Sequence, residues 1–86
     1  MSTEIERAVE FYDKACLVEE QDQIILAEAY CLKSSALFEQ IGGSHMRDAA
    51  KVLNRLAFLR ESGGNYEGSL YYAKKSAETT LFICGE

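Results

Sequence analysis

Residues Leu53–Ala77, LNRLAFLRESGGNYEGSLYYAKKSA, contain two helical patterns separated by a pair of glycines. Apolar residues before Gly63 recur at the three- and four-residue spacing of one helix face, and this spacing resumes after Asn65. Glycine commonly ends a helix, because it adopts a left-handed backbone without strain. The segment therefore predicts two antiparallel helices joined by a tight turn.

The rest of the chain follows the same organisation. It contains no proline, and a second glycine pair, Gly42-Gly43, punctuates the preceding part. We expect helices over residues 2–20, 23–41, 44–62 and 65–84. Asp22 and Ser44 are the expected N-caps of the second and third helices. The predicted fold is all-α: four antiparallel helices form two hairpins, as a right-handed α-solenoid fragment or a four-helix bundle.

The two halves of the chain align with each other. When the sequence is aligned with itself at an offset of 42 residues, small residues coincide. The pairs are Ala8/Ala50, Ala15/Ala57, Ala27/Ser69 and Ser34/Ser76. Small side chains let helices approach closely, and a regular period is typical of helical repeats. We therefore expect one domain over residues 1–86 that consists of two repeats, residues 1–43 and 44–86.

The apolar pattern also predicts which side chains are buried. In the helix over residues 44–62 we expect the core to comprise Ala49, Ala50, Val52, Leu53, Leu56, Ala57 and Leu59. In the helix over residues 65–84 the expected inward positions are Tyr66, Ser69, Leu70, Ala73, Ala77, Thr80 and Leu81.

The chain resembles the tetratricopeptide repeat (TPR) family, especially the longer repeats found in kinesin light chains. Leu56-Ala57 stands where the family has Leu-Gly or Leu-Ala, and Gly64-Asn65-Tyr66 stands where it has Gly-Asp-Tyr or Gly-Lys-Tyr. The first copy departs more, with Lys14 in place of leucine, and the family's closing proline is missing from both copies. A weaker resemblance is to the MIT domain, a three-helix bundle of trafficking proteins.

The TPR resemblance implies that a protein or peptide partner binds on the concave face, lined here by residues 2–20 and 44–62. The family's groove positions fall on Val9, Tyr12, Asp13, Cys16, Lys51, Asn54, Arg55 and Phe58. An asparagine amide suits a peptide backbone, and lysine or arginine suits an acidic side chain or a C-terminal carboxylate. The implied function is a non-catalytic adaptor or scaffold module.

Charge supports an alternative interpretation of the same residues. Residues 1–23 carry a net charge of -5, whereas residues 44–77 carry +3. Glu10 and Asp13 would then form internal salt bridges with the basic row Arg47, Lys51 and Arg55, which recurs at every fourth position.

Two repeats are fewer than most arrays need, which predicts an uncovered apolar end. We expect homo-oligomerisation, with the groove filled by a second copy, or a fragment of a longer array. Leu81, Phe82 and Ile83 are candidates for the uncovered surface.

Several function classes are disfavoured. The net charge of -5 argues against nucleic-acid binding, and no apolar run approaches membrane length. Three cysteines without paired spacing indicate reduced thiols in a cytoplasmic protein. His45 is the single histidine, and no spacing of metal ligands accompanies it, so we expect neither an enzyme nor a cofactor.

Overall fold

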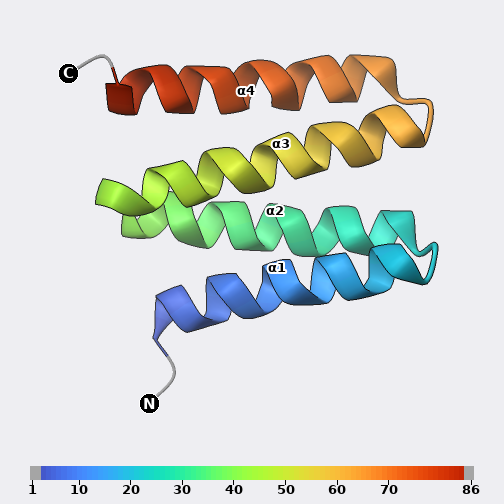
Figure 1. The fold of residues 1–86 in the computed structure, drawn as a ribbon, viewed down its shortest axis with the longest axis horizontal. Helices are drawn as coiled ribbons and strands as arrows, with labels where there is room; N and C mark the ends of the chain where they lie inside the picture. The colour runs from blue at the N-terminus through green and yellow to red at the C-terminus, as the bar shows by residue number, and fades with distance from the viewer. Residues whose placement is uncertain (1–2, 85–86) are drawn as a thin grey trace.

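Over residues 3–84 the fold consists of four consecutive antiparallel helices (Figure 1). The computed structural model describes residues 3–84, with side-chain surroundings up to residue 80. The helices are α1 (Glu4–Glu20), α2 (Ile24–Ile41), α3 (Met46–Ser62) and α4 (Tyr66–Cys84), and a 3-10 turn, η1 (Gly43–His45), precedes α3. Residues 3–84 contain no strand, so the predicted all-α class and the hairpin arrangement are confirmed.

The helices lie in two layers. The Cα atoms extend over 36 × 34 × 14 Å. A helix has a Cα radius of about 2.3 Å and packs about 8–10 Å from its neighbour, so the short dimension fits two layers of helices. Ion pairs also join alternate helices, α1 to α3 (Glu19–Arg55) and α2 to α4 (Glu39–Lys75). Figure 1 shows α1 and α4 at opposite edges of this open arrangement.

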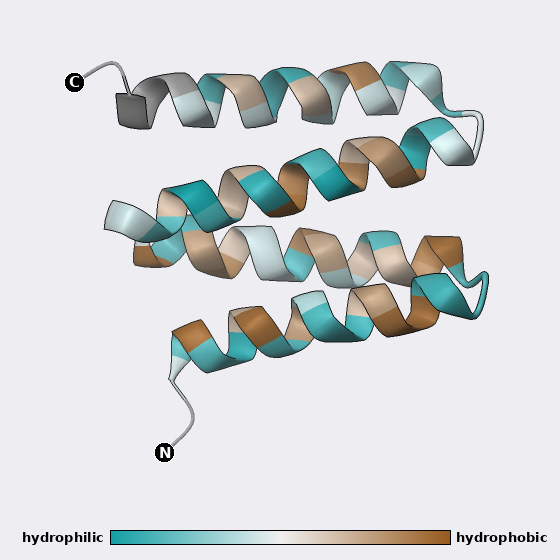
Figure 2. Cartoon of the chain, viewed as in Figure 1, coloured by the Kyte–Doolittle hydropathy of each residue, from teal (hydrophilic) through white to brown (hydrophobic). Residues whose placement is uncertain are grey.

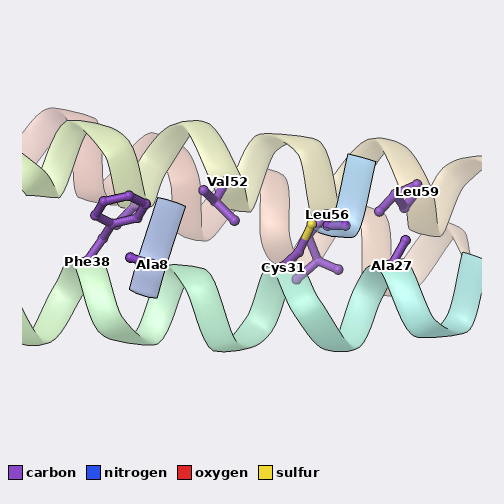
Figure 3. Close-up of a cluster of buried hydrophobic side chains, with 9 residues drawn as sticks. Ala8, Ala27, Cys31, Phe38, Val52, Leu56 and Leu59 are labelled. Atoms are coloured by element: carbon purple, nitrogen blue, oxygen red, sulfur yellow. The ribbon is translucent and has the colours of Figure 1, made fainter. Parts of the chain in front are cut away.

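The hydrophobic core lies where α3 packs on α2. All seven residues predicted as the core of α3 are buried, which confirms that prediction. Figure 3 shows Val52 and Leu56 of α3 directed toward α2, which contributes Cys31 and Phe38. Along α3, hydrophobic and hydrophilic segments alternate, as expected for a helix with one buried and one exposed face (Figure 2).

The predicted inward face of α4 is wrong. Tyr66 and Leu70 are 66% and 72% exposed, and Ala73 and Ala77 are also exposed. The reason is that α4 is the last helix and packs mainly on α3, which it contacts through a narrow face that includes the buried Ser76. The side chains of Leu81, Phe82 and Ile83 lie outside the described residues.

The two hairpins share one kind of interhelical hydrogen bond. The hydroxyl of Ser34 in α2 donates to the carbonyl of Ala8 in α1 at 2.7 Å. Its counterpart in the second repeat, Ser76 in α4, donates to the carbonyl of Ala50 in α3, also at 2.7 Å. A serine at this position therefore binds two helices together without a large side chain between them.

The two hairpin turns are also alike. The backbone N–H of Asp22 donates to Glu19, and that of Gly64, the equivalent residue of the second repeat, donates to Glu61. Both turn residues have positive φ, 61° for Asp22 and 83° for Gly64. Aspartate is one of the few non-glycine residues that tolerates this region, which explains how the first turn forms without glycine.

Two predicted helix caps are wrong. Asp22 occupies the left-handed turn position just described, so Gln23 is the N-cap of α2. Ser44 lies inside η1, which moves the start of α3 to Met46 and makes His45 its N-cap. By contrast, Thr3 caps α1 by accepting a hydrogen bond from the N–H of Glu6.

Candidate functional site

The predicted groove residues of α1 and α3 occupy matching positions in the two helices. In the repeat alignment, Val9, Tyr12, Asp13 and Cys16 coincide with Lys51, Asn54, Arg55 and Phe58, respectively. Their spacing places each set on one helix face. The structure brings these faces together over α2, so that α1 and α3 form two walls and α2 forms the floor.

A small cavity lies between these walls. Its volume is about 160 Å³, and its lining consists of Val9, Tyr12, Phe38, Asp48, Lys51 and Val52. Four of these side chains are apolar or aromatic, and the two charged ones both come from α3. The cavity therefore combines an apolar interior with one cation and one carboxylate on a single wall, and three predicted residues (Val9, Tyr12 and Lys51) contribute to it.

The carboxylate on this wall is held by a histidine. Asp48 Oδ2 lies 3.0 Å from His45 Nδ1, and the His45 ring stacks on Phe38 with 6.1 Å between centroids. His45 is therefore half-buried and engaged. Lys51, one turn after Asp48, is exposed, and it takes part in no ion pair within the described residues.

Arg55 has a different role from Lys51. Its Nε donates to Glu19 Oε1 at 2.9 Å, and its second guanidinium nitrogen lies 2.6 Å from the same oxygen. Burial would lower the pKa of Arg55, but the hydrogen bond and charge of Glu19 raise it on balance. The guanidinium also lies over the Phe58 ring, 5.6 Å from its centroid. Arg55 is thus committed to α1 and fixes the spacing of the two walls.

The alternative prediction of internal salt bridges is correct about the helices and wrong about the acids. Arg55 pairs with Glu19, whereas in the described part of the chain neither Glu10 nor Asp13 forms an ion pair. Glu10 and Asp13 are exposed on α1, while Glu19 lies at its C-terminal end, beside the turn. The C-terminal end of α1 therefore lies beside the middle of α3. Spacing along one helix does not reveal this offset between the two helices.

The remaining predicted residues surround the same groove without lining the cavity. Asn54 is exposed, and Phe58 is 54% exposed on the Arg55 side. Asp13 is exposed, and Cys16 is half-buried. Burial, followed by the neighbouring Cys16, raises the pKa of Tyr12, so the phenol stays neutral at physiological pH.

Three residues that line the cavity, Phe38, Asp48 and Val52, were not among the predicted site residues, and Glu19 was not the predicted partner of Arg55. Val52 was predicted as a core residue. Both Phe38 and Val52 belong to the hydrophobic core, and both also line the cavity. A repeat alignment shows which residues of α1 and α3 share a face. It does not show which residues of α2 line the space between α1 and α3, and for this reason it did not predict Phe38 as a site residue.

Beneath the groove lies a buried thiol. Cys31 is fully buried, and burial, followed by the nearby Cys16, raises its pKa to about 12. Cys16 and Cys31 are both free thiols. Because the thiolate is the reactive form, Cys31 is inert at neutral pH.

Among the described residues, no group of three or more His, Cys, Asp or Glu side chains is arranged to hold a metal ion. None of the helices there combines the length and hydropathy that a bilayer crossing requires.

Comparisons with known proteins assign neither a family nor a function to the chain. No protein-family model matches the chain, and neither the curated proteins nor the solved structures gave a match.

Proposed function

We propose that the chain is a non-catalytic, TPR-like helical module that binds a protein or peptide in the groove between α1 and α3. The observation that carries this proposal is the cavity of about 160 Å³ with its apolar interior and exposed Lys51. A concave apolar site with a few polar groups is the usual form of a binding site. The resemblance of residues 53–77 to TPR sequences supports the same surface.

The geometry favours a ligand with an apolar side chain next to a carboxylate. Val9, Tyr12, Phe38 and Val52 would surround the apolar side chain. Lys51 would pair with an acidic side chain or a C-terminal carboxylate, because its own charge is not engaged within the described residues. Asn54, one turn away and exposed, would bond the peptide backbone through its amide.

We expect Arg55 to join α1 and α3 through Glu19 and not to contact the ligand. Its two nitrogens already bind Glu19, so a ligand carboxylate would have to displace an internal ion pair. The free thiols Cys16 and Cys31 suit a reducing compartment, and we propose a cytoplasmic location.

The test is an NMR titration of the labelled chain with a randomised peptide library in two forms, one with free C-terminal carboxylates and one amidated. We expect peak shifts to cluster at Val9, Tyr12, Lys51 and Asn54, and to be larger with the free acids. Lys51→Glu should weaken binding about fivefold to tenfold, the effect of losing one exposed ion pair and adding repulsion.

Lys33→Glu is the matched control, because it makes the same charge change at an exposed position on α2 outside the groove. Equal weakening by both variants would show a general charge effect and contradict the groove assignment. Shifts at the groove residues on concentrating the chain without peptide would favour the alternative in which a second copy fills the groove.

A further inference from the structure

The outer face of α4 is apolar and uncovered. Five exposed residues occupy it, at spacings of four, three, four and three: Tyr66, Leu70, Ala73, Ala77 and Thr80. We call these residues the α4 seam. The alternation of four and three is the spacing of a helix that packs along a second helix. None of the five seam residues is charged. The two large ones, Tyr66 and Leu70, are nevertheless mostly exposed to solvent.

The internal repeat shows that this face is one that another helix covers. In the repeat alignment the seam positions coincide with Ile24, Glu28, Cys31, Ser35 and Phe38 of α2. Cys31 and Phe38 pack against α3, and Glu28 lies 3.1 Å from Arg60 of α3. The corresponding face of α4 is therefore shaped for an antiparallel helix, as α3 is antiparallel to α2.

The α1 helix of a second copy is not suited to pack on the α4 seam. The α3 residues that pack in the core are Ala49, Val52, Leu56 and Leu59. Their counterparts in α1 of the first repeat are Arg7, Glu10, Lys14 and Leu17, and only the last of these is uncharged. Placing α1 on the seam would bury these charges without partners, at a large cost. A head-to-tail array of copies is thus disfavoured.

The seam is instead complementary to itself. Its large residues, Tyr66 and Leu70, lie in the first half, and Ala73 and Ala77 lie in the second half. If two α4 helices pair antiparallel about a two-fold axis, Leu70 lies over Ala73 of the second copy and Tyr66 over Ala77 of the second copy. Each large side chain then meets a small one, as close helix packing requires.

Charges beside the seam fit the same pairing. In this register Glu67 lies next to Lys74 of the second copy, and the two-fold axis repeats the pair. Both residues are exposed, so they are available for such a contact. A parallel pairing would instead place each seam residue opposite its own copy, so that large side chains meet large ones and small side chains meet small ones.

We propose that α4 mediates an antiparallel, two-fold homodimer through the α4 seam. The interface lies on α4 and makes no use of the groove residues, so it is independent of the proposed peptide binding. Two short helices bury less than about 1,200 Å², the range of weak and reversible complexes, so the dimer should dissociate on dilution.

The test is sedimentation equilibrium of the full chain over a dilution series from about 1 mM to about 1 μM, the range in which such weak complexes dissociate. We expect a monomer–dimer equilibrium for the native chain, and Leu70→Glu should raise the dissociation constant at least tenfold. Tyr71→Glu is the matched control, since Tyr71 is 61% exposed on the same helix but lies off the seam. A native chain that stays monomeric throughout, or equal effects of the two variants, would overturn the proposal.

A charge exchange tests the register and does not depend on Leu70. Glu67→Lys and Lys74→Glu should each weaken the dimer, because each places like charges side by side, whereas the double variant should restore the native dissociation constant. Circular dichroism checks that every variant is folded. A double variant as weak as the single ones would exclude the antiparallel register.

Discussion

Replacing Ser34 with alanine should loosen the first hairpin by a predictable amount. Ser34 is fully buried, and its hydroxyl donates to the Ala8 carbonyl at 2.7 Å. Alanine keeps the Cβ and removes only the hydroxyl, so no large cavity forms. The substitution therefore isolates one hydrogen bond between α1 and α2.

The expected loss of stability can be estimated from the hydrogen bond that the substitution removes. A buried hydrogen bond contributes about 0.5–1.5 kcal/mol to stability on balance. The Ala8 carbonyl belongs to a helix and can keep a backbone bond, so it is not left wholly unsatisfied. We therefore expect Ser34→Ala to lower the free energy of unfolding by about 1 kcal/mol, and the midpoint of thermal unfolding by about 4–8 °C.

The adjacent serine provides the control. Ser35 is also buried, but its hydroxyl donates to the Leu32 carbonyl within α2 at 3.1 Å. Ser35→Ala removes a bond that joins no second helix, and alanine favours the helix more than serine does. We expect its effect on the free energy of unfolding, measured by urea denaturation, to lie within about 0.5 kcal/mol of zero.

The second hairpin makes the comparison stronger. Ser76→Ala removes the equivalent bond to Ala50, and the two bonds lie in different hairpins, so their effects should add. If Ser34→Ala and Ser76→Ala destabilise the chain no more than Ser35→Ala does, the interhelical bonds do not stabilise the hairpins, and the packing of small side chains alone must hold them together.

Two more predictions concern ionisation and backbone conformation. The unfolded Cys31 thiol ionises near pH 9, whereas in the folded chain its pKa is about 12. The free energy of unfolding should therefore be insensitive to this group below pH 9 and fall above it. At pH 10 it should be lower than at neutral pH by about 1 kcal/mol, and Cys31→Ala, measured by urea denaturation at both pH values, should lack this part of the decrease. Gly64→Ala should cost about 1 kcal/mol, because Gly64 has φ of 83° with open space around it, so the penalty is conformational only. The neighbouring Gly63→Ala should be nearly neutral, since Gly63 has φ of -84°, and comparable losses for both glycines would refute this account.

Sequence patterns predicted the burial of α3 and failed for α4, and the difference lies in the number of neighbours. α3 packs on both α2 and α4, so nearly every apolar position on it finds a contact. α4 has only α3 as its main neighbour, yet its sequence carries apolar residues on a second face. Periodicity reports which residues share a face, and it does not report whether another helix covers that face.

The candidate groove was predictable to a similar extent. The TPR resemblance assigned Val9, Tyr12 and Lys51 to the groove, and in the structure all three line one cavity between α1 and α3. It did not reveal that Arg55 is paired, since the choice among Glu10, Asp13 and Glu19 depends on how α1 is displaced along α3.

The groove and the seam are two consequences of the same repeat. One repeat stacked on another creates a groove between the first helices of the two units, and it leaves the last helix with a face made for a further helix. The cavity of the groove is lined by residues of α1, α2 and α3, whereas the seam lies on α4. A dimer formed through the α4 seam would therefore leave the groove of each copy open. Seam variants such as Leu70→Glu should then retain native peptide affinity, and each dimer should present two grooves to its partners.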